Sequence, residues 1–213
     1  MEEARVYTCG SSNSVRNRLF KKEDAMFIKI DGTKVSGKAE ICNADGKNGY
    51  TGDFNFTLQD IADIILSAKK PLLIAGGGVR YYEAGKTVED FCKKFNIALA
   101  ETQNGKSAVL SSHSHNLGGV GVTGNLAANR IAKDADVVIG VGTRFSDFTT
   151  ASKSLYQNPD VKFVTINTDR FDAYKLDAVK CVGDAKLTVE KLDKILSEKG
   201  YKTAYTTEIA DAK

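Results

Sequence analysis

The spacing of hydrophobic positions divides the chain into two unlike parts that meet near residue 57. Residues 1–56 are polar and rich in turn-forming dipeptides, with short β-like runs at residues 5–9, 26–30 and 38–42. We expect this part to be a leader with a few short strands or irregular structure. From residue 57 onward, segments with helical spacing of apolar residues alternate with short, continuous apolar runs that indicate buried strands.

This alternation predicts a doubly wound, Rossmann-like α/β domain over residues 57–199, because strands separated by helices form right-handed crossovers in a parallel sheet. We expect five to six strands with helices on both faces of the sheet. The predicted strands are residues 72–75, 97–100, 136–141, 162–166 and 178–182, and the predicted helices are residues 57–70, 83–95, 123–132 and 187–196. Residues 200–213 form a tail without periodicity, which we expect to fray.

Composition and charge exclude several classes of partner. The 30 basic and 27 acidic residues leave a net charge of +3, too small for binding to nucleic acid or a membrane surface by charge alone. The sequence has no apolar run long enough to span a bilayer and no secretory signal at residues 1–14, so a cytoplasmic protein is expected. The 4 cysteines lie far apart, as is typical of reduced thiols, and the 19 glycines carry the most information.

Glycine and polar clusters follow the predicted strands, and ligands of doubly wound sheets bind beyond the carboxyl ends of the strands. Backbone N–H groups there could approach a phosphate, an arginine could pair with an anion, and an aspartate could accept from ribose. Close packing, an arginine over the sheet edge and an aspartate that caps a turn are the structural alternatives. The candidate cofactor-binding residues are Gly76, Gly77, Gly78, Gly119, Gly121, Gly124, Gly142, Thr143, Arg144, Phe145, Asn167 and Asp169.

The dinucleotide fingerprint is incomplete in this sequence. After Gly76 and Gly78, Tyr81 stands where the third glycine is needed, although Glu101 lies where a ribose-binding acid is expected. A literal GxGxxG occurs at residues 119–124, but the residues before it do not have a strand pattern. An independent NAD-dependent enzyme therefore remains only an alternative.

Few residues are candidates for catalysis or metal binding. His113 and His115 form an HxH pair without a third ligand at suitable spacing, so we expect solvated loop histidines. Ser111, Ser112 and Ser114 lack the context of a nucleophile elbow. The sequence thus predicts neither catalytic residues nor metal ligands in this chain.

Four stretches of sequence resemble a known family. They are GGGVRYYEAG, AETQNGKS, NLGGVGVTGNLAANRIAKDADVVIGVGTRFSDFTTASK and YQNPDVKFVTINTDRFDAYKLDA. Over about residues 69–191 the chain resembles the central domain of thiamine diphosphate-dependent enzymes. Most narrowly, it is similar to the hydrolases that open the ring of trihydroxycyclohexane-1,2-dione in inositol catabolism.

The resemblance implies an enzyme with two further domains. A pyrimidine-binding domain supplies a glutamate that activates thiamine, and a diphosphate-binding domain holds magnesium through a GDG motif and a later asparagine. Asp184 stands in a Gly-Asp-Ala sequence with no suitable asparagine after it. The chain is therefore expected to be the middle domain of a longer, homo-oligomeric enzyme and to be inactive alone. Residues 1–56 do not resemble the pyrimidine domain, which leaves a linker insertion or an introduced sequence open.

Relatives such as acetohydroxyacid synthase hold FAD in this central domain, and the resemblance implies that the twelve strand-end residues named above would be its contacts. The hydrolase branch does not generally require FAD. A crevice that binds an adenine nucleotide, an empty crevice, and a crevice that docks the other domains remain open, as does a non-catalytic nucleotide-binding module.

Overall fold

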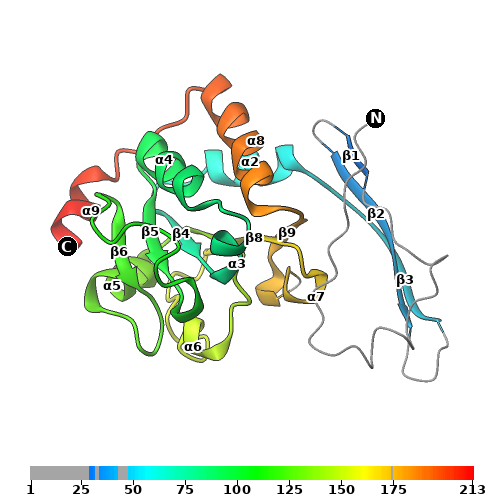
Figure 1. Ribbon diagram of the computed structural model, residues 1–213, viewed down its shortest axis with the longest axis horizontal. Helices are drawn as coiled ribbons and strands as arrows, with labels where there is room; N and C mark the ends of the chain where they lie inside the picture. The colour runs from blue at the N-terminus through cyan, green and yellow to red at the C-terminus, as the bar shows by residue number, and fades with distance from the viewer. Residues whose placement is uncertain (1–28, 32–33, 43–47, 174) are drawn as a thin grey trace. The chain divides into compact units, whose positions relative to one another are not determined.

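The computed structural model describes residues 29–31, 34–42, 48–173 and 175–213 (Figure 1). The chain divides into two compact units, Met1–Gln59 and Asp60–Lys213.

The first unit contains an antiparallel sheet with the strand order β1-β2-β3. The strands are β1 (Lys29–Asp31), β2 (Lys34–Cys42) and β3 (Asn48–Thr57). β1 and β2 overlap two of the predicted β-like runs, whereas the run at residues 5–9 lies outside the described residues. The sequence pattern did not predict β3, because Gly49 and Gly52 interrupt its alternation of residues.

The second unit is built on a six-stranded sheet with the order β6-β5-β4-β7-β8-β9, in which every neighbouring pair is parallel. The strands are β4 (Pro71–Ala75), β5 (Ala98–Glu101), β6 (Asn116–Gly119), β7 (Val137–Val141), β8 (Lys162–Asn167) and β9 (Val179–Val182). The order reverses between β4 and β7. The predicted doubly wound, Rossmann-like α/β fold is therefore confirmed.

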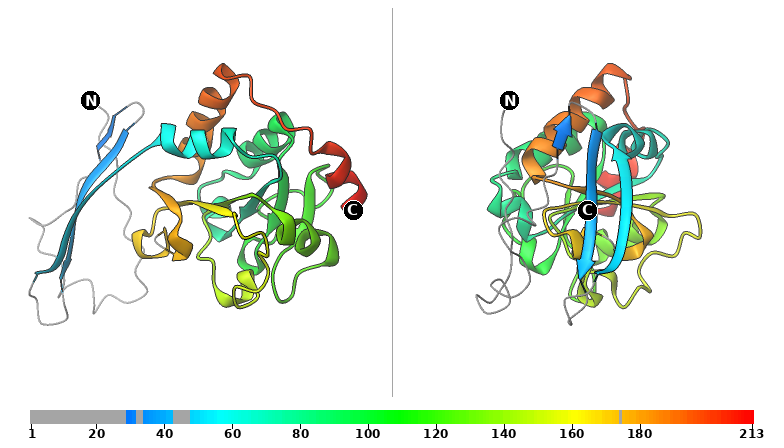
Figure 2. Two further views of the ribbon diagram at one scale, coloured as in Figure 1. Left: turned by 180° about the vertical axis from the view of Figure 1, so that it is seen from behind. Right: turned by 90° about the vertical axis from the view of Figure 1, so that its right-hand side faces the viewer.

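Helices cover both faces of this sheet (Figures 1 and 2). α4 and α8 contact each other on one face, and α5 and α9 contact each other on the other. The helices of this unit are α2 (Leu58–Leu66), α3 (Gly77–Tyr81), α4 (Gly85–Phe95), α5 (Leu126–Asp134), α6 (Asp147–Thr150), α7 (Arg170–Ala173), α8 (Ala185–Glu198) and α9 (Thr206–Ala212), with short 3-10 helices η2 (Gln103–Gly105) and η3 (Lys175–Asp177).

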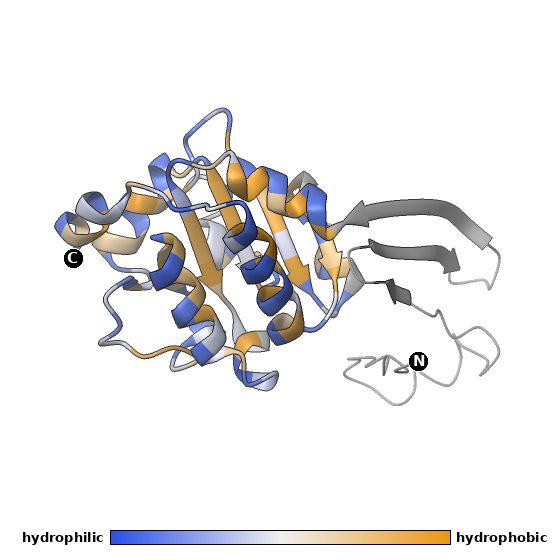
Figure 3. Cartoon of the chain, turned by 90° about the horizontal axis from the view of Figure 1, so that it is seen from above, coloured by the Kyte–Doolittle hydropathy of each residue, from blue (hydrophilic) through white to orange (hydrophobic). Residues whose placement is uncertain are grey.

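The core lies along the central strands. All five residues of β4 and of β7 are buried, as expected for apolar runs covered by helices on both sides. Figure 3 shows these hydrophobic strands between helices whose outer faces are hydrophilic. Pro71 is tolerated because it is the first residue of its strand, where a missing N–H group costs little.

Capping side chains set two helix starts that the apolar spacing placed slightly wrongly. Asn125 accepts from the N–H of Ala128 at 3.0 Å, so α5 begins at Leu126 rather than at residue 123. Asp184 accepts from the N–H of Leu187 at 2.9 Å, so α8 begins at Ala185. The cap, and not the first apolar residue, determines where each helix begins.

β6 corrects one sequence interpretation. The residues before the GxGxxG segment were expected not to form a strand, yet Asn116–Gly119 pairs with β5, with Leu99 opposite Asn116 and Glu101 opposite Gly119. A hydrogen bond of 2.9 Å from the Asn116 side chain to buried Glu101 anchors the strand. This long-range contact produces a strand where the local sequence is polar and glycine-rich.

The C-terminal segment was also predicted wrongly. Instead of a frayed tail, residues 206–212 form α9, and Tyr205 and Ile209 are buried in the same cluster as Ala128 and Ile131 of α5. The N–H of Thr203 also donates to the carbonyl of Phe95 at 3.1 Å. The segment folds because its two large apolar residues, one helical turn apart, contact the domain core.

We expect Ile209→Ala to lower the free energy of unfolding by about 2–5 kcal/mol, because it removes a fully packed side chain. Thr207→Ala, at an exposed position of the same helix, is the matched control and should change it by less than about 0.5 kcal/mol. Urea unfolding followed by circular dichroism measures both. Equal stability of the two variants would contradict a core role for α9.

Candidate functional site

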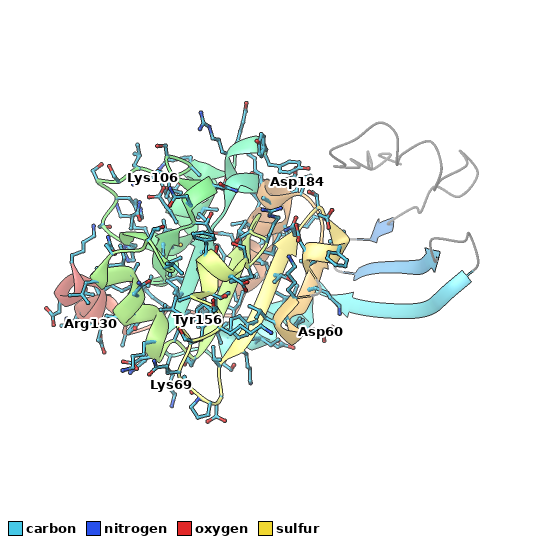
Figure 4. The ribbon with its side chains drawn as sticks, turned by 90° about the horizontal axis from the view of Figure 1, so that it is seen from below. Asp60, Lys69, Lys106, Arg130, Tyr156 and Asp184 are labelled. Atoms are coloured by element: carbon cyan, nitrogen blue, oxygen red, sulfur yellow. The ribbon has the colours of Figure 1, made fainter. Side chains whose placement is uncertain are left out.

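The site predicted from the sequence lies at the carboxyl ends of the strands. Figure 4 shows Lys106 and Asp184, which follow β5 and β9, on the side of the sheet opposite Lys69, which precedes β4. The turn after β4 meets the turn after β7 where the strand order reverses, the usual place of a ligand crevice.

Backbone groups connect these two turns directly. The N–H of Gly76 donates to the carbonyl of Val141 at 2.8 Å, and the N–H of Gly78 donates to the carbonyl of Gly142 at 3.0 Å. The N–H of Gly142 in turn donates to the carbonyl of Ile166 at 2.8 Å. These three donors are therefore already used inside the protein.

The glycines allow this close approach. A Cβ atom on Gly76 would lie 2.2 Å from the carbonyl oxygen of Gly142, and one on Gly78 would lie 2.7 Å from the Cα atom of Gly142. Gly142 itself has φ of +60°, a conformation that strains other residues. Backbone packing thus fills the position where the strand order reverses.

Asn167 and Asp169 join the same site from β8. Asn167 donates through Nδ2 to the carbonyl of Thr143 at 3.0 Å and accepts through Oδ1 from the N–H of Asp169 at 3.0 Å. Asp169 accepts in turn from the N–H of Asp172 at 3.0 Å. One of its oxygens is consequently used to start α7, the capping role that the sequence left open.

Arg144 and Phe145 differ in what they offer to a ligand. The Arg144 side chain is exposed and forms no ion pair with any residue that the structure describes, so it can meet an anionic group. Phe145 is buried, and its ring lies edge-on to Phe163 with 6.0 Å between centroids. Of these two neighbours, only Arg144 presents a functional group to solvent.

The loop of residues 119–124 uses its N–H groups internally. Gly121 donates to Asn129 Oδ1 at 2.9 Å, and Asn129 Nδ2 returns a bond of 2.9 Å to the Gly121 carbonyl. Val122 donates to the carbonyl of Phe148 at 2.8 Å, and Gly124 donates to that of Gly121 at 2.9 Å. The loop after β6 is thereby fastened to α5 and α6.

Glu101 does not present its carboxylate at the crevice. It is 1% exposed and accepts from the N–H of Ser107 and from Asn116 Nδ2, each at 2.9 Å. Lys106 Nζ lies 3.8 Å from the same carboxylate. Because both oxygens hold the β5–β6 connection, Glu101 is unsuited to the ribose contact that an NAD site requires, and Tyr81 still replaces the third glycine.

Sequence reasoning missed a second buried acid, Glu89 of α4. Its Oε1 accepts from the N–H of Leu110 at 2.5 Å, so Glu89 and Glu101 fix the β5–β6 connection at two points. An open cavity of about 500 Å³ lies beside it and includes Lys86 and Lys106 in its lining. The available signal was an acid next to Val88 on the buried side of a helix, which requires a polar partner.

One of the two histidines also differs from expectation. His115 is 8% exposed rather than solvated, its Nδ1 lies 2.9 Å from Ser114 Oγ, and its Nε2 has no hydrogen-bond partner among the described residues. Burial lowers the pKa of His115 below the ordinary 6.5, and the charges of His113 and Lys213 lower it further. Within the described residues no group of three or more His, Cys, Asp or Glu could hold a metal ion.

We expect Gly142→Ala to lower the free energy of unfolding by about 2–5 kcal/mol, from a left-handed conformation and from overlap with Gly78. Gly200→Ala is the matched control, because Gly200 has φ of +64° but open space around it, and should cost only about 1–2 kcal/mol. Chemical unfolding of both variants separates the two effects. Equal losses would show that backbone packing at Gly142 contributes nothing.

We also expect the free energy of unfolding to fall between about pH 7 and pH 5.5, because the unfolded chain takes up a proton near pH 6.5 that buried His115 resists. His115→Gln should reduce this slope, and the double variant with His113→Gln should reduce it most, since burial also lowers the pKa of His113. Urea unfolding at several pH values measures the slope. An unchanged slope in His115→Gln would contradict the assignment.

The described helices were also compared with the requirements of a membrane span, and none of them has both the length and the apolar character that crossing needs.

Comparison with known proteins places the second unit in a family. Residues 58–192 match the model of the thiamine pyrophosphate enzyme central domain. A trihydroxycyclohexane-1,2-dione hydrolase, 3D-(3,5/4) isomer, of Clostridium perfringens is 59% identical over 155 residues, which are 73% of this chain and 24% of that protein. The protein of the same name from Clostridium botulinum is 63% identical over 151 residues, 71% of this chain and 24% of its own length.

The protein of this name from Bacillus cereus is 56% identical over 221 residues, 92% of this chain and 34% of its own length. Such coverage cannot be confined to residues 57–213, which make up about three-quarters of the chain, so part of residues 1–56 also aligns with a natural relative. The chain spans about a quarter to a third of the length of the curated relatives that it matches. The chain therefore belongs to the thiamine diphosphate-dependent enzymes, of which it forms the central domain.

Proposed function

We propose that this chain is the central domain of a hydrolase that cleaves a carbon–carbon bond and opens the ring of 3D-(3,5/4)-trihydroxycyclohexane-1,2-dione. The observation that carries the proposal is identity of 56–63% with proteins of that name, which extends over 71–92% of the chain. Inositol catabolism as the pathway, the cytoplasm as the compartment and a homo-oligomeric full-length enzyme remain predictions from the sequence.

The cofactor of the family belongs to other parts of the polypeptide. Thiamine diphosphate needs a magnesium site, and the described residues offer no group of three or more His, Cys, Asp or Glu for one. Asp184, the acid of the Gly-Asp-Ala sequence, instead accepts from the N–H of Leu187 and caps α8. The described residues do not fit the thiamine site, and we assign them no step of the reaction.

The proposed contribution of this domain is to position the domains that perform the chemistry. Its strand-end loops are fixed by side-chain hydrogen bonds, with buried Glu89 and Glu101 holding the β5–β6 connection and half-buried Asn129 holding the loop after β6. Loops held in this way form a rigid surface, and rigid elements keep a catalytic constellation in place better than mobile ones.

FAD or an adenine nucleotide in the strand-end crevice, with contacts to the twelve residues predicted from the sequence, stays a prediction. The internal hydrogen bonds of Gly76, Gly78, Gly121 and Gly142 favour the alternative in which these glycines serve close packing. Arg144 is the exposed cation that a phosphate would meet. Titration calorimetry with ADP and with FAD, on the natural chain and on Arg144→Ala, tests the crevice directly.

We expect the full-length enzyme that contains this chain to open the dione ring when thiamine diphosphate and magnesium are supplied. The 213-residue chain alone should give no ring-opened acid under the same conditions, because its described residues offer no magnesium site for the cofactor. Product formation followed by mass spectrometry measures both, with the full-length enzyme lacking thiamine diphosphate as the control.

The same assay with pyruvate distinguishes the acetohydroxyacid synthase-like alternative, which would form acetolactate. Ring opening without acetolactate supports the hydrolase. Turnover of the dione by the 213-residue chain would contradict its role as a domain without a cofactor site, and failure of the full-length enzyme to open the ring would contradict the proposed substrate.

A further inference from the structure

Large apolar side chains are exposed along the carboxyl ends of the strands. Among residues 58–213, apart from 170, 174 and 177, every exposed large apolar side chain lies in a segment that follows the end of a strand. The seven side chains are Tyr81, Leu110, Val122, Leu126, Phe148, Phe171 and Leu187. All except Leu110 lie within seven residues after a strand, whereas Leu110 lies six residues before β6.

Three of these residues are contributed by two segments in contact, and we call Val122, Leu126 and Phe148 the loop patch. Val122 and Phe148 are joined by the backbone hydrogen bond of 2.8 Å between the loop after β6 and α6. Leu126 is the first residue of α5 and follows the same loop. Their exposed fractions are 60%, 71% and 65%.

α6 reverses the usual arrangement of apolar and polar side chains. Thr149 and Thr150 are buried, with 6% and 1% of their surface exposed, whereas the neighbouring Phe148 points its ring surface to solvent. A short surface helix that only served the core of its own domain would bury the phenylalanine and expose the threonines. This reversal indicates a surface that another protein segment covers.

The backbone that carries the loop patch is tightly held. Gly121 has φ of +106°, and a Cβ atom there would lie 2.0 Å from the carbonyl oxygen of Phe148, so the loop and α6 touch through their backbones. Asn129 bonds both the N–H and the carbonyl of Gly121, and the N–H of Val120 donates to the carbonyl of Glu101 at 2.9 Å. A preformed apolar surface loses little entropy when a partner binds.

We propose that the loop patch is the surface on which another domain of the same polypeptide docks. The chain spans 24–34% of the length of its relatives, so about two-thirds or more of such an enzyme lies outside it. An aromatic ring, two aliphatic side chains and the exposed Arg144, four residues before Phe148 in the sequence, match the composition of interface cores. The inference rests on the proposed role of the chain as the central domain of a longer enzyme.

Hydrogen–deuterium exchange of the full-length enzyme and of the 213-residue chain tests this proposal. Peptides that cover residues 119–130 and 146–152 should exchange at least tenfold more slowly in the full-length enzyme, at every protein concentration. The combined variant Val122→Ser, Leu126→Ser and Phe148→Ser should remove that protection. In the 213-residue chain the same variant should keep the natural melting temperature within a few degrees, because these side chains are exposed.

Phe171→Ser is the matched control, since Phe171 is 81% exposed but follows β8, towards the other edge of the sheet. Phe171→Ser should leave the exchange protection of residues 119–130 and 146–152 intact. Loss of that protection in this control would show that the docking surface lies elsewhere. Equal exchange in the two proteins would overturn docking altogether. Protection that disappears as subunits dissociate on dilution would assign the surface to a second copy instead. The readout does not depend on activity, so protection without ring opening would refute the proposed substrate and leave the docking surface standing.

Discussion

The contact between the backbones of Gly76, Gly78 and Gly142 determines the geometry of the strand-end face. In a parallel sheet all carboxyl ends lie at one edge, and the segments that follow diverge most where the strand order reverses. Here the turns after β4 and β7 instead hydrogen-bond to each other through Gly76, Gly78 and Gly142. Because no side chain lies between the two turns, the beginning of α3 and the segment that leads to α6 are held in fixed positions.

The same contact limits the chemistry that this face can perform. Dinucleotide folds bind pyrophosphate with free N–H groups at a glycine turn, but Gly76, Gly78 and Gly142 donate theirs to carbonyl groups of the protein. The accessible side chains of this face include the guanidinium of Arg144, which forms no ion pair with a described residue, and the apolar surface around Phe148. Such a face is better suited to contact with another protein surface than to a phosphate cradle.

The parts of the fold that depend on local sequence were predictable, and those that depend on distant partners were not. β4 and β7 are continuous apolar runs, which already specify strands buried on both faces. β6 depends on the bond between Asn116 and Glu101, and α9 depends on contact of Ile209 with the core. The glycine clusters were expected to lie at one edge and they do, but the partner that uses each N–H group could only be identified in three dimensions.

Phe148 shows why a domain of a larger enzyme cannot be interpreted from its own core alone. Apolar residues are expected to be buried in the complete folded assembly, and not necessarily within each of its domains. Phe148, which is exposed beside two buried threonines, departs from this expectation only when this chain is considered alone. Most of the other exposed large apolar residues in the described part of the chain also lie within seven residues after a strand, and the exception is Leu110, which lies six residues before β6. The exposed ring of Phe148 and its apolar neighbours Val122 and Leu126 form the kind of surface that another protein segment covers, which is the contact that we propose.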